Sequence, residues 1–400
     1  MRPRRPHSAF RAGILVAVAV SAVALPFAAA QAQEIVTTIT NEQLVAATGD
    51  YPSVALDSRG RGVVAWRDGA AVAGPVISIR ARQFNGTTFG APFQVGFPKP
   101  GIAAEDPRVA MDARGNFIVV WSEGEVHGQL FRADGRDRGI FILSPGGVGA
   151  FHPEVAMAGD GRFAVAYEQS TSDPTRSVRL ATFNPRGTRF GKPVTMNAIG
   201  TMANTLGAVS ASANSVAVGW TEFTPCPSNP IDPVSAVATF NWSLRPLGAT
   251  DRLANDNPCV DGPQVLAMPN SDLGPLGIFV GRRYSIQRFS NADGTRVGPR
   301  TNVADLPSCA GSTCDRVLAV AGDRRGRFVF IWERFENNAY SLYGELYGRE
   351  GAKRVERFAI SSYDSTEGEQ PAAAFTSDGT LVVTWYRAAE GVLMRSFKIE

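Results

Sequence analysis

Residues 107–121 read PRVAMDARGNFIVVW, and this stretch decides the fold because variants of it recur along the chain. A short apolar segment that begins with proline leads into a DxxG turn, and an apolar run ending in an aromatic residue follows. The other clear copies are PSVALDSRGRGVVAW at 52–66, PEVAMAGDGRFAVAY at 153–167, LAVAGDRRGRFVFIW at 318–332 and PAAAFTSDGTLVVTW at 371–385. Weaker copies at 206–220 and 263–281 fit a period of about 53 residues, so one structural unit is repeated along the chain.

A second pattern follows the first in each unit. It consists of an apolar stretch ending in an aromatic residue, a glycine-containing turn and another apolar stretch, as in GQLFRADGRDRGIFIL at 128–143. Runs such as IVVW and LVVTW are β-branched and continuous, which is typical of strands covered on both faces. The DxxG segments and Asp134-Gly135 are tight-turn sequences. Each unit is therefore predicted to hold two β-hairpins.

Four antiparallel strands in each unit of this period are typical of a β-propeller blade. We predict an all-β chain folded as a single seven-bladed β-propeller, with four antiparallel strands per blade. The predicted blades are residues 51–105, 106–151, 152–205, 206–261, 262–316, 317–369 and 370–400 plus 35–46. The segment at 35–46 would supply the missing strand of the last blade, so that the N-terminal strand closes the ring and covers an exposed edge.

The N-terminal residues have the pattern of an export signal. Four arginines precede an uncharged stretch at 12–25, and Pro26 and small residues follow, so residues 1–32 are predicted to be a signal peptide and residues 33–400 the propeller. Cleavage is expected after Ala30 or Ala32. The apolar part falls short of the roughly 20 residues of a membrane span, although an uncleaved anchor stays the alternative. We therefore expect a periplasmic or secreted protein.

The chain holds four cysteines, which in an exported protein favour disulfides over metal ligands. Cys309 and Cys314 enclose a short AGST loop and are expected to pair with each other. Cys226 and Cys259 would then form the second bridge. Two other pairings, and four free thiols, remain as alternatives.

Residues 35–400 resemble bacterial secreted repeat proteins whose blades read PxVAxDxxGxFVVxW, followed by an RxFxxDGxxxG hairpin. The resemblance is carried by the first three, the sixth and the seventh units and is poor in the fourth and fifth. It implies a β-propeller and a location outside the cytoplasm. It implies no activity, because such proteins are largely uncharacterised.

Sequence motifs for catalysis and for cofactors are absent. After the signal peptide only His127 and His152 remain, and the chain has no HExxH, CxxC, GxSxG or glycine-rich phosphate loop. No cofactor is expected, with calcium left open. The first 33 residues hold four arginines and no acid, so the formal charge changes from +3 for the chain to −1 for the remainder. With no basic stripe, a nucleic-acid partner is not expected.

An acidic residue closely follows the repeat aromatic in five units. Strand order places these residues near one face, where loops surround the mouth of a propeller channel. Ligand contacts are predicted at Asp68, Glu123, Glu168, Glu222, Glu333, Tyr363 and Asp364, with Glu105, Asp106 and Glu367 in neighbouring connections. Solvated turn residues are the alternative interpretation. The repeat tryptophans are expected to pack between blades, whereas Trp242 breaks the register and could contact a ligand.

The function predicted from the sequence is that of an exported, monomeric binding or scaffold module for a protein or glycan, acting at the channel mouth. The first alternative is a carbohydrate-active enzyme, a glycoside hydrolase or lyase, that uses carboxylates at the mouth, since two acids at a set distance suffice for such chemistry. The second alternative is a purely structural surface protein.

Overall fold

The computed structural model describes residues 34–69, 77–96, 102–144, 149–170, 176–196, 204–224, 232–254, 264–267, 275–280, 283–290, 293, 295–305, 314–323, 325–336, 339–361, 370–376 and 378–400. Every regular element in these ranges is a β-strand. Within the same ranges there is no helix of the length and apolarity needed to cross a membrane. The predicted signal peptide lies outside the described residues.

The strands form seven antiparallel sheets, numbered here in chain order. The first sheet holds β3 (Asp50–Leu56), β4 (Arg61–Asp68), β5 (Ser78–Asn85), β6 (Thr88–Phe89) and β7 (Phe93–Val95). The second holds β8 (Glu105–Met111), β9 (Phe117–Ser122), β10 (Val126–Phe131) and β11 (Asp137–Ile142). The third holds β12 (Ala150–Met157), β13 (Phe163–Ser170), β14 (Arg176–Phe183) and β15 (Val194–Thr195).

The fourth sheet holds β16 (Asn204–Ala211), β17 (Val216–Thr224), β18 (Asp232–Phe240) and β19 (Asp251–Ala254). The fifth holds β20 (Gln264–Ala267), β21 (Pro275–Val280), β22 (Arg283–Phe289) and β23 (Arg296–Asp305), and the sixth β24 (Cys314–Gly322), β25 (Phe328–Glu336), β26 (Ala339–Tyr347) and β27 (Lys353–Ala359). The seventh holds β28 (Ala372–Phe375), β29 (Thr380–Arg387), β30 (Gly391–Ile399), β1 (Val36–Thr38) and β2 (Gln43–Ala46).

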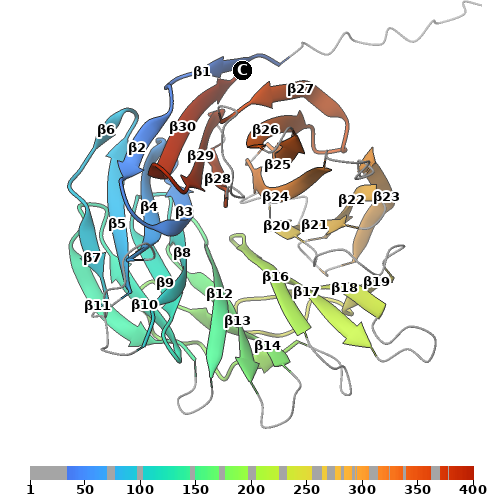
Figure 1. The fold of residues 1–400 in the computed structure, drawn as a ribbon. Helices are drawn as coiled ribbons and strands as arrows, with labels where there is room; N and C mark the ends of the chain where they lie inside the picture. The colour runs from blue at the N-terminus through green and yellow to red at the C-terminus, as the bar shows by residue number, and fades with distance from the viewer. Residues whose placement is uncertain are drawn as a thin grey trace, which may run out of the picture. The chain divides into compact units, whose positions relative to one another are not determined.

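Within the unit Glu34–Glu400 the sheets have the arrangement of a β-propeller (Figure 1). The strand of each sheet that comes first in its unit lies innermost and contacts the corresponding strand of the next sheet, in the order β3, β8, β12, β16, β20, β24 and β28. β28 also contacts β3. Both β1 and β2 pair with β30, so segments from the two ends of the unit share one sheet.

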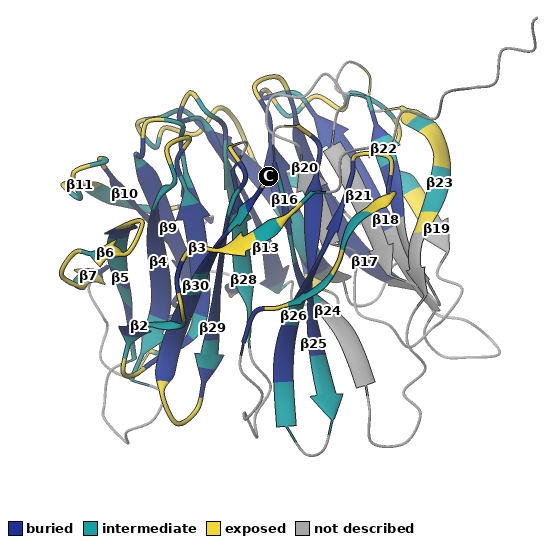
Figure 2. Ribbon diagram, turned by 90° about the horizontal axis from the view of Figure 1, so that it is seen from above, coloured by how far each residue is buried: buried dark blue, intermediate teal, exposed yellow. Residues whose placement is uncertain are grey.

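In the first four, the sixth and the seventh sheets, the core consists mainly of the second strand and the aromatic residue near its end. Trp66, Trp121, Trp220, Trp332 and Trp385 are each at most 2% exposed. Four of these tryptophans pack in apolar clusters with residues of the preceding sheet. They are Trp66, Trp121, Trp220 and Trp385. The predicted packing role of these tryptophans is therefore confirmed. In Figure 2 the buried residues form the middle of the sheets, and exposed residues gather in the turns.

Trp242 also packs in the core, although its position breaks the repeat. It is 7% exposed, its indole Nε1 donates to the carbonyl oxygen of Ser212 at 3.3 Å, and the Arg162 guanidinium lies 4.7 Å from its ring centre. The structure thus gives Trp242 a packing role between the third and fourth sheets.

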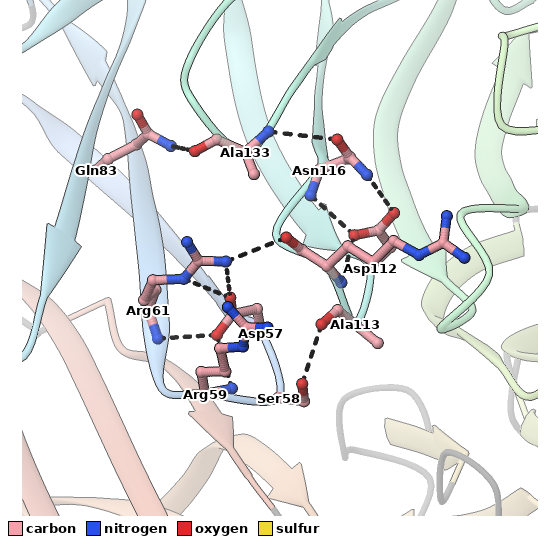
Figure 3. Close-up of polar contacts among 10 residues, drawn as sticks. Asp57, Ser58, Arg59, Arg61, Gln83, Asp112, Ala113, Asn116 and Ala133 are labelled. Carbon is pink, nitrogen blue, oxygen red and sulfur yellow. Dashed lines mark hydrogen bonds and ion pairs between the residues drawn. The ribbon is translucent and has the colours of Figure 1, made fainter.

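The DxxG turns join the first and second strands of the sheets and also connect neighbouring sheets (Figure 3). The carboxylate of Asp57 accepts hydrogen bonds from the backbone N–H groups of Arg59 and Arg61 and from Arg61 Nε. Arg61 Nη2 then donates to the carbonyl of Arg114 in the next turn at 3.1 Å, and Ser58 Oγ donates to that of Ala113 at 3.0 Å. The turns therefore hold adjacent sheets in register at this face.

Candidate functional site

The five acidic residues predicted to line the channel mouth stand at corresponding places in five sheets. Asp68 ends β4 and Glu123 directly follows β9, whereas Glu168, Glu222 and Glu333 lie within the last four residues of β13, β17 and β25. Four of the side chains are buried: Glu123, Glu168, Glu222 and Glu333 are between 1% and 4% exposed. Only Asp68, whose side chain is 22% exposed, offers appreciable surface. The acids are thus brought to one end of the sheets, but mostly beneath its surface.

Two of these carboxylates accept a hydrogen bond from the repeat tryptophan two positions earlier. Trp121 Nε1 donates to Glu123 at 3.4 Å, and Trp220 Nε1 donates to Glu222 at 3.1 Å. Residues two apart on a strand share a face, so the acid is carried to the buried side with the indole. Arg252 pairs with Glu222 through two hydrogen bonds, and this contact raises the arginine pKa.

Glu168 links the third sheet to the fourth. One carboxylate oxygen accepts the backbone N–H of Leu206 at 3.1 Å, while the other lies 3.2 Å from Arg176 and 3.4 Å from Nδ1 of His152. A buried carboxylate with a backbone donor and a cationic partner has its hydrogen-bonding capacity satisfied. Glu168 is therefore held in one position directly behind the half-exposed His152.

Three residues at this end of the sheets have a left-handed backbone that only glycine adopts easily. Tyr51, Asp106 and His152 have φ angles of 49°, 52° and 48°, and each directly precedes the proline of its repeat. A register irregularity occurs at the same place in β3, β8 and β12, which marks a β-bulge. Bulges redirect side chains, and strained backbone of this kind is often found at functional sites.

The bulges bring a group of charged side chains together, named here the mouth cluster: Tyr51, Arg67, Glu105, Asp106, Arg108, His152, Glu154, Glu168 and Arg176. Nε2 of His152 lies 3.7 Å from Asp106, so the imidazole stands between the carboxylates of Asp106 and Glu168. The hydrogen bond to Glu168 is the main reason that the pKa of His152 is raised above its ordinary value of 6.5. This imidazole is therefore biased toward its cationic form.

Arginines hold the neighbouring parts of the mouth cluster in place. Arg67 makes two hydrogen bonds to Asp50, at 2.7 and 2.6 Å, and its guanidinium lies 4.5 Å from the ring centre of Tyr51. Arg108 pairs with Glu154 at 2.7 Å, which joins the second sheet to the third. Glu105, His152 and Arg176 have about half of their side-chain surface exposed, at 51%, 52% and 49%. These three can meet a ligand without any rearrangement of the ion pairs.

The remaining predicted site residues lie elsewhere or are not described. Tyr363, Asp364 and Glu367 lie outside the described residues, as do Cys226, Cys259 and Cys309, while Cys314 is the first residue of β24. His127 is 6% exposed and stacks on Trp121, with ring centres 5.6 Å apart. No group of three or more metal-ligating side chains occurs in the described part of the chain.

The position directly before the repeat proline is the sequence signal that points to the mouth cluster. From the sequence, Asp106 is predicted to lie in a connection, and neither His152 nor Tyr51 is among the predicted ligand contacts. Reading that one position across the units would have grouped all three. Their positive φ angles depend on the pairing register of the inner strands, which the repeat pattern alone does not reveal.

Comparison with known proteins identifies the fold but no family. No family model matches the chain, and no curated protein is similar to it. Solved structures are similar at low identity. An ulvan lyase matches with a TM-score of 0.53 and 9% identity over 88% of this chain and 95% of its own. The Dos1 propeller matches with a TM-score of 0.50 and 10% identity, over 90% of this chain and 95% of its own.

A third similar structure is an α-L-arabinofuranosidase of Fusarium graminearum, with a TM-score of 0.50 and 10% identity over 88% of this chain and 92% of its own. Identities this low establish a common architecture and leave activity open. The chain therefore has the β-propeller fold shared by these proteins.

Proposed function

We propose that the chain is an exported binding module, a seven-bladed β-propeller that recognises a glycan or protein ligand through the mouth cluster. In this proposal each of the seven sheets is one blade, and the pairing of β1 and β2 with β30 closes the ring. Residues 1–32 direct export and are removed, and the four cysteines form the bridges Cys226–Cys259 and Cys309–Cys314.

The observation that supports the binding proposal is that carboxylates of the mouth region are paired with arginines. Asp50, Glu154 and Glu168 are each engaged by an arginine, so these acids serve to position other groups. Exposed imidazole, guanidinium and carboxylate groups surround them on bulged strands. Rigid, mixed-charge surfaces of this kind suit polar ligands with hydroxyl and charged groups. Two of the similar folds act on glycans, so glycans are the first ligands to test.

A catalytic alternative rests on His152. An imidazole between the two carboxylates Asp106 and Glu168, with Arg176 nearby, has the elements of general acid-base chemistry. A carbohydrate-active enzyme would use His152 to move a proton at the sugar, with an arginine facing a substrate carboxylate. In a simple binding module these groups only orient the ligand.

A glycan array and a pull-down from the native cell envelope test the binding proposal. We expect a specific ligand whose affinity falls at least about tenfold in His152→Gln and in Arg176→Gln. Arg136→Gln is the matched control, because Arg136 lies outside the mouth cluster and its side chain is 77% exposed. Product formation on the bound glycan would instead support the enzyme. Negative results for binding and for activity would leave a structural protein.

Export and the disulfides have separate tests. We expect the N-terminus of the purified envelope or medium protein to begin after Ala30 or Ala32. Mass spectrometry of the non-reduced protein should find peptides joined through Cys309 and Cys314. Alkylation of all four thiols without a reductant would overturn the disulfide proposal.

A further inference from the structure

A pocket of about 380 Å³ lies between the seventh sheet and the first, and it contains one of the predicted site residues. Its polar wall consists of Thr48, Trp66, Asp68, Arg80 and Arg82, and its apolar wall includes Val45 at the end of β2. We name it the indole pocket. It is separate from the mouth cluster because Trp66 and Asp68 share one face of β4, whereas Arg67, which belongs to the mouth cluster, points to the other.

The indole pocket exists where the first sheet departs from the repeat. In the second and fourth sheets a glutamate two positions after the tryptophan accepts the indole N–H. The first sheet has Asp68 at that position, one methylene shorter, and its carboxylate instead accepts a hydrogen bond from Thr48 Oγ1 at 2.8 Å. Trp66 Nε1 consequently has no hydrogen-bond partner among the described residues. The second and fourth sheets thus show the hydrogen bond that the first sheet lacks.

A second donor in the same wall is also unpaired. Arg80 stands directly opposite Trp66 in the β4–β5 register, and its Nε has no hydrogen-bond partner in the described part of the chain. The closest approach of Arg80 to Asp68 is 3.7 Å, beyond hydrogen-bond distance. Buried donors normally find an acceptor, so two unpaired donors beside a cavity indicate an acceptor that the protein itself does not supply.

An indole nitrogen without a hydrogen-bond partner is not by itself evidence of a ligand site. Trp385 Nε1 in the seventh sheet is likewise without a partner among the described residues. There, however, the position two residues later holds Arg387, which is 5% exposed and is paired with Glu42 and Glu390 at 3.1 and 2.8 Å. Only in the first sheet does the unpaired indole belong to the wall of a described pocket that also holds a loosely paired arginine.

The charges of the indole pocket define the ligand. Arg80 and Arg82 outnumber Asp68, which favours an anion. Arg82 is anchored through hydrogen bonds to the carbonyls of Gly90 and Val45, so Arg80 is the arginine able to turn toward a ligand. A compact anion such as inorganic phosphate would bring its whole charge close to Asp68 and be repelled by it. A ligand with hydroxyl donors as well as a carboxylate would satisfy Arg80, Asp68 and Trp66 together.

We propose that the indole pocket binds a single acidic sugar residue, a hexuronic acid. Its carboxylate pairs with Arg80, and one hydroxyl donates to Asp68. Trp66 Nε1 has almost no accessible surface in this structure, so a small shift of the indole lets a second hydroxyl accept from it. The volume is at the lower end of the range for small-molecule pockets and suits one sugar ring. Because the indole pocket and the mouth cluster are different surfaces, either proposal can fail without the other.

Calorimetric titration of the purified full-length mature protein with glucuronic acid, galacturonic acid, glucose and inorganic phosphate tests this inference. We expect binding of at least one uronic acid and a weaker interaction, by at least about tenfold, with glucose and with phosphate. Equal binding of glucose, equal binding of phosphate, or no binding of either uronic acid would overturn the proposal.

Two variants locate the site. Asp68→Glu restores the arrangement of the second and fourth sheets, so it should cap Trp66, lower uronic-acid affinity at least about tenfold and leave the Tm unchanged or higher. Arg80→Gln should lower affinity similarly without unfolding the chain. Arg136→Gln is the matched control and should bind as the unchanged protein does. If Asp68→Glu and Arg80→Gln both bind normally, or if His152→Gln abolishes uronic-acid binding, the indole pocket is not the site.

Discussion

Replacing Asp112 with alanine tests how much the hydrogen bonds within a DxxG turn contribute to the stability of the fold. The Asp112 side chain is buried at 4% exposure and accepts three hydrogen bonds, from Arg114 N at 2.9 Å, Asn116 N at 2.8 Å and Asn116 Nδ2 at 2.7 Å (Figure 3). Alanine removes the acceptor and leaves these donors without their partner. At about 1 kcal/mol for each bond, the free energy of unfolding should fall by about 3 kcal/mol.

The expected change in Tm follows from the size of the unit. An unfolding entropy of about 2.1 cal/mol/K per residue amounts to about 0.8 kcal/mol/K for a unit as long as Glu34–Glu400. A loss of about 3 kcal/mol therefore lowers the Tm by about 4 °C. Differential scanning calorimetry of the purified protein measures this shift directly.

Asp134→Ala is the matched control for Asp112→Ala. Asp134 occupies a similar turn in the β10–β11 hairpin, but its side chain is 53% exposed, and its hydrogen bond to Arg136 N is 3.1 Å long. Water replaces that contact, so the Tm should change by less than about 1 °C. Asp112→Asn keeps one acceptor oxygen and should give an intermediate shift. Equal shifts for Asp112→Ala and Asp134→Ala would refute the role given to the turns.

Three further predictions concern the other sites. The raised pKa of His152 means that its stabilising contribution is complete below its unfolded value of about 6.5 and is lost as the pH rises through the folded value. The Tm difference between the unchanged protein and His152→Gln should therefore be largest near pH 6 and shrink at higher pH, and an NMR titration midpoint at or below 6.5 would contradict this. Glu222→Ala leaves Trp220 and Arg252 without their shared acceptor, so the free energy of unfolding should fall by about 2 to 4 kcal/mol in denaturant titrations, whereas no change would show that the buried acid is dispensable. Deleting residues 34–46 removes β1 and β2 from β30, so calorimetry should show a lower Tm and light scattering should show association through the exposed edge, and an unchanged Tm would argue against ring closure by this segment.

The sequence predicts the elements well because each one has a local chemical cause. The PxVAxDxxG pattern gives a strand start, an Asp-capped turn and a buried strand end, and β8 and β9 with Asp112 between them reproduce that order. The burial of Glu123 and Glu222, each two residues after a repeat tryptophan, could also have been predicted, since alternate residues share a face. Glu123 and Glu222 are instead predicted to be mouth residues from strand order alone, without regard to the face that each side chain occupies.

Other features depend on contacts between units and cannot be found from one unit alone. The bulge at His152 arises from the pairing of β12 with β13, and its partner Asp106 comes from the preceding sheet. The indole pocket likewise needs β2, from the first residues of the unit, to lie beside Trp66 and Arg80. No local pattern specifies that neighbour. The substitution of aspartate for glutamate at position 68 becomes informative only after the indole contacts of the other sheets are known.

The pairing of β1 and β2 with β30 has a consequence for the order in which the molecule is made. Within the unit Glu34–Glu400 a ribosome produces β1 and β2 before the other strands, yet their partner β30 is the last strand of the unit, and the bond from Ser396 N to Thr40 Oγ1 spans 356 positions. Closing so long a loop is entropically slow, and no shorter intermediate can complete the seventh sheet. The chain must therefore stay incompletely folded until its final strand is delivered. Under the export proposed above, in which the chain crosses a membrane in an extended form, that delay is an advantage, because the last folding step falls on the far side.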